Sequence, residues 1–153
     1  ADVMNGLLDV AVLFTPRPHP DLYFETLGEV TYQMVSTEAS DLGEVRPESY
    51  FLANYATAFT ATHAALLPAL SAVSVSSGQD TVIRGLLTAR GGSAYVLRDT
   101  ALDLERAGQA QRVARAPRIA QPVYAAIHMR ARHRGAHRRI VKAFRGQFTT
   151  KNM

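Results

Sequence analysis

The chain has 153 residues, with 17 Lys and Arg, 13 Asp and Glu, and no Cys. This length suits one domain or two small lobes, and a hydrophobic content of 47% excludes a disordered or collagen-like chain. The lack of Cys excludes disulfides, thiolate metal sites and a cysteine nucleophile. No apolar run reaches the roughly 18–20 residues that cross a bilayer, and no signal peptide is visible. We therefore expect a cytoplasmic protein with no membrane partner.

The net charge of +4 conceals a division along the chain. Residues 1–100 carry five Arg and eleven acidic residues, whereas residues 101–153 carry twelve Lys and Arg and two acidic residues. The densest basic stretch is 129–139, with five Arg, two His and no aromatic residue. Such a run is typical of a solvated surface or of contacts with nucleic-acid phosphates. The lack of interleaved aromatic residues argues against binding of a single strand.

Short apolar runs alternate with amphipathic stretches along the chain. In chain order, the patterns predict strands at 9–14 and 30–36, a polar connector at 37–48, a strand at 50–53, a helix at 57–70, a strand at 73–76, a helix at 77–90, a strand at 94–97, a helix at 100–106, an edge strand at 111–115, a strand at 121–128 and a helix from about 134. The alternation of strands and helices indicates an α/β fold with mostly parallel pairing.

Two local signals refine the helix at 77–90. Ser77 followed three positions later by Asp80 is typical of a capping box at a helix start. Gly91 and Gly92 are typical of a helix end, because glycine adopts the left-handed conformation that closes a helix.

Several segments resemble, in order, the effector-binding domain of LysR-type transcriptional regulators. The segment 5–12, Asn-Gly-Leu-Leu-Asp-Val-Ala-Val, is similar to a signature of the first lobe of that domain. The resemblance continues through 22–36, 75–97, 111–113, 123–128 and 134–148. It therefore spans nearly the whole chain, and its specificity lies in the order of the segments rather than in any one of them.

The resemblance implies two Rossmann-like lobes joined by two crossovers, as in type 2 periplasmic binding proteins. The first lobe would comprise 1–36 and 119–153, and the second lobe 37–118. No segment resembles the winged helix-turn-helix of the family or the first strand and helix of the first lobe. We therefore expect an incomplete first lobe with an unpaired strand edge. The connector 37–48 is also shorter than the family usually has.

The resemblance also implies a function. The domain would sense a small, anionic effector in the cleft between its lobes and would assemble as a dimer or tetramer. DNA would be contacted only through the missing N-terminal domain, and no cofactor or metal is expected. By resemblance, the effector-contacting positions are Phe14, Thr15, Thr57, Phe59 and Thr60.

The residues themselves support an anion site and leave alternatives open. Helix starts near Thr57 and Ser77 offer free N–H groups and a partial positive charge, which suit a small carboxylate. Arg17 could pair with that carboxylate through two hydrogen bonds, or it is a solvated loop residue. Thr57 also suits an N-cap, and Phe59 lies at a spacing that also suits a core residue.

Histidines and serines give no support for an enzyme or a metal site. His133 and His137 share helical spacing and could join His128 on a zinc ion, but the surrounding arginines repel a dication. His63 lies on an apolar stripe, as a core or interface histidine does. No Gly-x-Ser-x-Gly turn or phosphate-binding loop is present, so a small α/β enzyme is disfavoured. A stand-alone solute-binding module remains the second interpretation.

Overall fold

The computed structural model describes residues 10–13, 19–128, 139 and 141–146, and only the backbone of Val10–Leu13 and His128. The chain divides into two compact units. Unit 1 comprises Ala1–Val30 and Gln121–Met153, and unit 2 comprises Thr31–Ala120. The chain passes from unit 1 to unit 2 within strand β2 and returns within strand β7.

Unit 1 is built on strands β1 (Val10–Leu13), β7 (Ile119–His128) and the first part of β2 (Leu22–Ser36). β7 lies between β1 and β2, and β1 pairs with it antiparallel. The apolar run around β1 predicts a parallel sheet, and this expectation is wrong for β1. The strand predicted at 30–36 is also longer than expected, because β2 begins at Leu22.

The core of unit 1 follows strand and helix periodicity. Alternate residues of β7 point to one face, as the two-residue period of a strand requires. The buried members of this core are Leu27, Val123, Ala125, Ile127 and Val141. Val141 and the half-buried Phe144 lie three positions apart in a helical segment, 141–146, that contributes this face. Arg145 in the same segment donates to the carbonyl oxygen of Thr26 (Nε···O 3.0 Å).

Unit 2 contains a mixed sheet in the order β2, β5, β3, β4, with β6 on the outer edge of β2. These strands are β5 (Ser93–Leu97), β3 (Tyr50–Ala53), β4 (Ser76–Ser77) and β6 (Gln111–Arg112). β3 runs parallel to β4 and β5, whereas β2 runs antiparallel to β5 and β6. Parallel pairing is therefore confined to strands that crossover helices connect, because a crossover returns the chain to the same end of the sheet.

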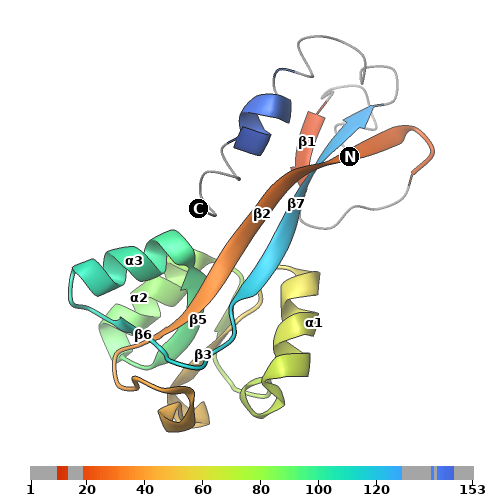
Figure 1. Cartoon of the computed structure of the whole chain (residues 1–153). Helices are drawn as coiled ribbons and strands as arrows, with labels where there is room; N and C mark the ends of the chain where they lie inside the picture. Colours follow the sequence, from red (N-terminus) through yellow and green to blue (C-terminus); the bar gives the residue numbers. More distant parts are fainter. Residues whose placement is uncertain (1–9, 14–18, 129–138, 140, 147–153) are drawn as a thin grey trace. The chain divides into compact units, whose positions relative to one another are not determined.

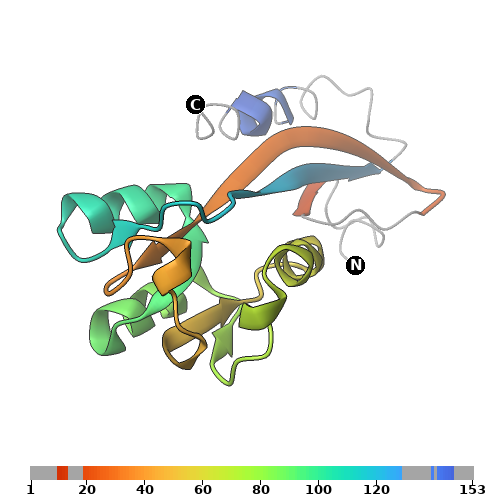
Figure 2. The ribbon, with the colours of Figure 1, turned by 60° about the horizontal axis from the view of Figure 1, so that its bottom comes forward.

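Three helices cover the two faces of this sheet (Figures 1 and 2). α2 (Asp80–Arg90) and α3 (Arg98–Arg106) lie on one face, and α1 (Thr57–Leu66) lies on the other. α1 is shorter than predicted because Pro68 lacks the N–H that would continue it, and a 3-10 turn (Pro68–Leu70) follows. α2 ends at Gly91 (φ 73°), as predicted. None of the described helices is long and apolar enough to cross a membrane.

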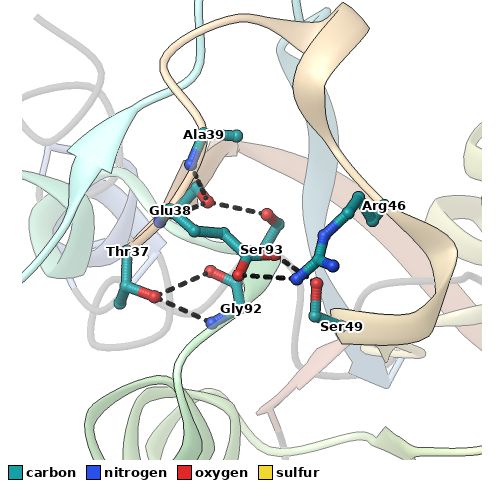
Figure 3. Close-up of polar contacts among 8 residues, drawn as sticks. Thr37, Glu38, Ala39, Arg46, Ser49, Gly92 and Ser93 are labelled. Atoms are coloured by element: carbon teal, nitrogen blue, oxygen red, sulfur yellow. Dashed lines mark hydrogen bonds and ion pairs between the residues drawn. The ribbon is translucent and has the colours of Figure 1, made fainter.

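The connector after β2 contains two 3-10 turns, Leu42–Glu44 and Pro47–Ser49, and a polar network fixes its start (Figure 3). Ser36 is fully buried, and its hydroxyl oxygen accepts the N–H groups of Glu38 (3.1 Å) and Ala39 (2.9 Å). The hydroxyl of Ser93 donates to the same oxygen (2.8 Å). Ser36 therefore joins the end of β2 to the start of β5.

Gly92, which precedes β5, also contacts the start of the connector, at Thr37 (Figure 3). Its N–H donates to the Thr37 hydroxyl oxygen (2.8 Å), and its carbonyl accepts the Thr37 N–H (2.9 Å). Gly92 has φ 141°, and a Cβ there would lie 2.2 Å from the carbonyl oxygen of Ser49. Only glycine fits, because any side chain would collide with backbone. At the rim, Glu38 accepts from Arg46 (3.1 Å) and from the Ser49 hydroxyl.

Candidate functional site

Three helix starts meet at one edge of the sheet of unit 2. Because β3 is parallel to both β4 and β5, the carboxyl ends of these strands share an edge. Each strand leads into a helix: β3 into α1, β4 into α2 and β5 into α3. Their first N–H groups, with the partial positive charge of a helix start, therefore lie at this edge. We call it the helix-start edge; ligands of α/β proteins commonly bind at such edges.

Asp80 occupies the start of α3. One of its carboxylate oxygens accepts the N–H of Leu97 (2.9 Å), and the other accepts the hydroxyl of Thr100 (2.7 Å). A carboxylate at this position satisfies a free N–H group and offsets the positive end of the helix dipole. The start of α3 is therefore already occupied by an anion of the protein itself.

The capping box predicted for Ser77 and Asp80 is wrong. The N-cap of α2 is Gln79, and the Ser77 oxygen accepts the N–H of Gln79 (3.2 Å). Ser77 belongs to β4, so it lies two positions too early to cap the helix. Asp80 is free to reach α3 because it is not held by Ser77.

The start of α1 differs, because among the described residues no side chain is seen to cap it. Its N-cap is Ala56, which has no side-chain oxygen, and its first turn contains no acidic residue. The interpretation of Thr57 as the N-cap is therefore wrong, since Thr57 is the first helical residue. Thr57 and Thr60 are both exposed, so their hydroxyl groups stay accessible beside the first N–H groups of the helix.

An aromatic cluster lies beneath the start of α1. Its members are Tyr32, Tyr50, Tyr55, Phe59, His63 and Tyr95. Tyr32 and Tyr55 stack at 4.6 Å between ring centroids, and Phe59 meets Tyr32 edge to face at 4.9 Å. Phe59 has no exposed surface. Its ring therefore forms the floor under the helix-start edge rather than a surface that a ligand touches in this structure, which agrees with the core interpretation of Phe59.

His63 is a core histidine in a hydrogen-bonded chain. The Ser71 hydroxyl donates to the carbonyl oxygen of Leu67 (3.0 Å), so its oxygen accepts from Nδ1 of His63 (3.2 Å). Nε2 of His63 then accepts the hydroxyl of Tyr50 (2.7 Å). Burial lowers the pKa of His63 and raises the pKa of Tyr50, so both are neutral. The serine proton points at a carbonyl and His63 is 1% exposed, so this chain is structural.

The sequence pattern does not single out two further residues of this edge. Tyr55 is half-buried, and its hydroxyl donates to the carbonyl oxygen of Tyr95. Tyr32 lies opposite Leu97 in the strand pairing. Burial and, to a lesser extent, the charge of Asp80 raise the pKa of Tyr32 to about 12. Strand alternation predicts which face of the sheet Tyr32 occupies. No local sequence pattern predicts its contact with Tyr55.

Some predicted residues lie outside the part of the chain whose side chains the structure describes. These are Phe14, Thr15, Arg17, His128, His133 and His137. Their roles stay predictions, as does any role of most of the basic stretch 129–139. Among the described residues, no group of three His, Cys, Asp or Glu is placed to hold a metal ion.

Unit 2 has two hollows that no residue of α1 lines. One, of about 360 Å³, is lined by 47–51, 72–75, Arg90 and Gly91, at the amino end of β3. The other, of about 220 Å³, lies between β2, β6 and the segment 114–118.

The sequence of this chain matches no protein-family model and no curated protein. Solved structures, in contrast, resemble it over nearly its whole length. The regulatory domain of OxyR2 from Vibrio vulnificus, in its reduced form, covers 95% of this chain at 15% identity, with 74% of its own length matched and a TM-score of 0.68. The regulatory domain of MetR, a LysR family regulator from Neisseria meningitidis, covers 98% at 12% identity, with 74% of its length matched and a TM-score of 0.69.

Full-length LysG from Corynebacterium glutamicum, solved with its effector Arg bound, is also similar. It covers 96% of this chain at 13% identity, with 53% of its own length matched and a TM-score of 0.63. At such low identity these likenesses report on the fold alone. The chain has the mixed α/β fold of the regulatory, effector-binding domains of LysR-type transcription regulators, as the order of its sequence segments predicts.

Proposed function

We propose that this chain is the effector-sensing part of a LysR-type transcription regulator. The observation that carries the proposal is the fold likeness, which extends over 95–98% of this chain and 74% of the OxyR2 and MetR regulatory domains. In this proposal the first lobe comprises 1–36 and 119–153, and the second lobe comprises 37–118. The division into two compact units supports two lobes formed in this way, although the units divide at 30–31, six residues before the proposed boundary, and at 120–121.

The effector is a small molecule that carries a carboxylate or another anionic group. The start of α1 supports this assignment, because its N-cap is an alanine without a side-chain acceptor for the first N–H groups and its first turn has no acidic residue. Thr57 and Thr60 supply hydroxyl groups beside it, while Asp80 already fills the corresponding position at α3. Phe14, Thr15 and Arg17 would contribute from the first lobe. The effector arginine of LysG also has a carboxylate, which fits this class of ligand.

Regulation follows from differential affinity. An effector that binds one arrangement of the lobes more tightly shifts the population toward it, and thereby shifts the arrangement of a homo-oligomer on DNA. DNA is read by a winged helix-turn-helix outside this chain, in the cytoplasm, and no chemical step is catalysed. No observation in the structure favours a stand-alone solute-binding module.

Thermal unfolding with a panel of small carboxylates and their neutral amides tests the proposal. A carboxylate at about 100 times its Kd stabilises the chain by about 2.7 kcal/mol, which is roughly 5–10 °C in Tm for this size. The neutral amide of the same acid should give little shift, because it lacks the charge that the helix start attracts.

Three variants make this test specific. Thr57→Val and Thr60→Val keep the shape of the side chain but remove the hydroxyl, and each should reduce the ligand-induced shift. Thr62→Val changes an exposed threonine of α1 that lies five positions after Thr57, and it serves as the matched control. Equal shifts in all three variants would remove the start of α1 from the effector site.

A further inference from the structure

We propose that Tyr32 is a further effector-contacting residue of the helix-start edge, and that its hydroxyl donates to an uncharged oxygen of the effector. The proposal rests on the proposed function, since it adds a second contact to the carboxylate site at the start of α1. It narrows the effector class from carboxylates in general to carboxylates that carry a second, uncharged oxygen. An oxo acid, with a ketone beside its carboxylate, is the simplest member of that class.

The tyrosines of the aromatic cluster differ in what their hydroxyl groups contact. Three of the four hydroxyl groups have partners within unit 2: Tyr50 with His63, Tyr55 with the Tyr95 carbonyl, and Tyr95 with the Pro117 carbonyl. The Tyr32 hydroxyl is the exception, because it makes no hydrogen bond with any residue that the structure describes. The cluster therefore has one phenol group whose hydrogen bond is left for another molecule.

The Tyr32 hydroxyl reaches accessible surface although the residue as a whole is only 3% exposed. Among the described residues, Gln33 Oε1 is the one fully buried polar side-chain atom without a partner. The Tyr32 oxygen also lacks a described partner, so it is not fully buried. Its ring is thus held by packing while its polar tip stays open, as is common for tyrosine. A ligand can reach this hydroxyl without any rearrangement of the ring.

The contacts of the Tyr32 ring place it at the helix-start edge. Tyr32 lies opposite Leu97, which is the last residue of β5 and the N-cap of α3. The ring stacks on Tyr55, which directly precedes the N-cap of α1. It also meets the ring of Phe59, in the first turn of α1. Tyr32 therefore lies next to the starts of both α1 and α3, where a carboxylate finds the N–H groups of α1.

The charge near the hydroxyl selects the group that it binds. Asp80 accepts the N–H of Leu97, so its carboxylate lies at the same edge. Burial, and then the charge of Asp80, raise the pKa of Tyr32 to about 12, as expected for a hydroxyl that points toward this edge. Tyr32 is therefore a neutral donor at physiological pH. Because Asp80 repels a second carboxylate there, the acceptor is an uncharged oxygen, and the carboxylate of the effector lies at α1.

Titration of the ¹⁵N-labelled chain with matched acids, followed by NMR, tests this contact. The probes are 2-oxobutanoate with butanoate and 4-oxopentanoate with pentanoate, which differ within each pair by one ketone oxygen. All four should give saturable shifts of the backbone amides of Thr57 and Thr60. We expect the oxo acid of at least one pair to bind about two- to tenfold more tightly, because it gains the hydrogen bond from Tyr32.

Two variants remove one hydroxyl each. Tyr32→Phe keeps the ring and its stacking, so it should abolish the preference for the oxo acid and leave the affinity for the plain acid unchanged. Tyr55→Phe is the matched control and should keep that preference, because its hydroxyl is already bonded to the carbonyl of Tyr95. The Tm of the free chain should fall in Tyr55→Phe and stay unchanged in Tyr32→Phe, since only Tyr55 loses a partner in the protein.

The outcomes separate this contact from the effector site itself. Equal affinity within both pairs of acids, or a preference that survives in Tyr32→Phe, would overturn the role of Tyr32 while the carboxylate site at α1 stands. Absence of saturable shifts at Thr57 and Thr60 with all four acids would overturn the proposed effector site, and this contact with it. A fall in Tm in Tyr32→Phe as large as in Tyr55→Phe would show that the hydroxyl is bonded within the protein. The comparison of acids in the wild type needs no variant to fold.

Discussion

Two buried polar side chains lie three positions apart on β2, and their hydrogen bonding is opposite. Ser36 is fully buried, and its oxygen accepts three hydrogen bonds from the connector and from β5. Gln33 is 8% exposed, and its Oε1 accepts no hydrogen bond from any residue that the structure describes. Burial alone does not distinguish them. The number of hydrogen-bond partners does distinguish them, and it gives Ser36 a structural role in joining β2, the connector and β5.

The same comparison holds for the helix starts of unit 2. At α3, the carboxylate of Asp80 accepts the N–H of the N-cap residue, Leu97, and a threonine hydroxyl. At α1, the N-cap is an alanine and the first turn has no acid. Sites that the protein saturates itself are structural, whereas sites that it leaves open are the candidates for binding.

The largest expected effect is a loss of stability in Gly92→Ala, a substitution next to the hydrogen-bond network of Ser36. A Cβ at Gly92 would lie 2.2 Å from the Ser49 carbonyl oxygen, and φ 141° is strained for alanine. We expect the free energy of unfolding to fall by about 3 kcal/mol or more, measured by urea denaturation.

Gly85→Ala is the matched control for that substitution. Gly85 lies in the middle of α2, and an added Cβ would meet nothing within 4 Å. It should stabilise the chain by about 0.5–1 kcal/mol, because alanine favours a helix interior. Similar effects of the two substitutions would contradict the close approach of Gly92 to Ser49.

A smaller effect is expected from Ser36→Ala. The variant leaves the N–H groups of Glu38 and Ala39 and the hydroxyl of Ser93 without their acceptor. We expect a loss of about 2 kcal/mol in denaturant unfolding. Gln33→Met should have the opposite sign, with a gain of about 1 kcal/mol, since it removes an unpaired acceptor. Loss of stability in both variants would break the comparison, because it would show that Gln33 is paired in solution.

The smallest effect concerns the exposed rim of the Ser36 network. The hydrogen bond from Ser49, and then the contact with Arg46, hold the pKa of Glu38 below its ordinary value. A carboxylate whose pKa is lower in the folded chain stabilises it above the ordinary carboxyl pKa, and this contribution disappears as the pH falls through the lowered pKa. In Glu38→Gln, the free energy of unfolding should therefore fall less steeply as the pH is lowered, which denaturant unfolding at a series of pH values measures.

The size of this pH effect is limited by solvent. The Glu38 side chain is 33% exposed and that of Arg46 is 62% exposed, so screening keeps the contribution to a fraction of about 1 kcal/mol. Glu48→Gln removes a charge from the same connector and serves as the control. If the free energy of unfolding depends on pH in the same way in the wild type and in Glu38→Gln, the contacts of Glu38 with Arg46 and Ser49 contribute nothing to stability.

Local sequence patterns predicted most elements of the fold. The strand at 50–53 and the helix end at Gly91 are found where the pattern places them, because both depend on neighbours in the chain. β4 overlaps its predicted range, 73–76, only at Ser76. The expectation of mostly parallel pairing was wrong for β1 and β2, since pairing direction depends on how distant segments return to the sheet.

The candidate sites were predictable only in part. The sequence indicated the start of α1 and named Thr57 and Thr60, because a helix start is a local feature. It could not show that Ala56 rather than Thr57 is the N-cap, nor that Phe59 lies fully inside an aromatic cluster. It also could not show that Gln33 Oε1 has no partner among the described residues, because that depends on neighbours in space rather than in the chain.

The sequence by itself determined the order of strands and helices, the α/β class and the resemblance to LysR-type regulatory domains. The tertiary structure alone decided which polar groups are satisfied. Asp80 and Leu97 are 17 residues apart in the chain, and Ser36 and Ser93 are 57 apart. Periodicity and capping act over one or two turns, whereas hydrogen-bond partners are set by packing across the whole sheet.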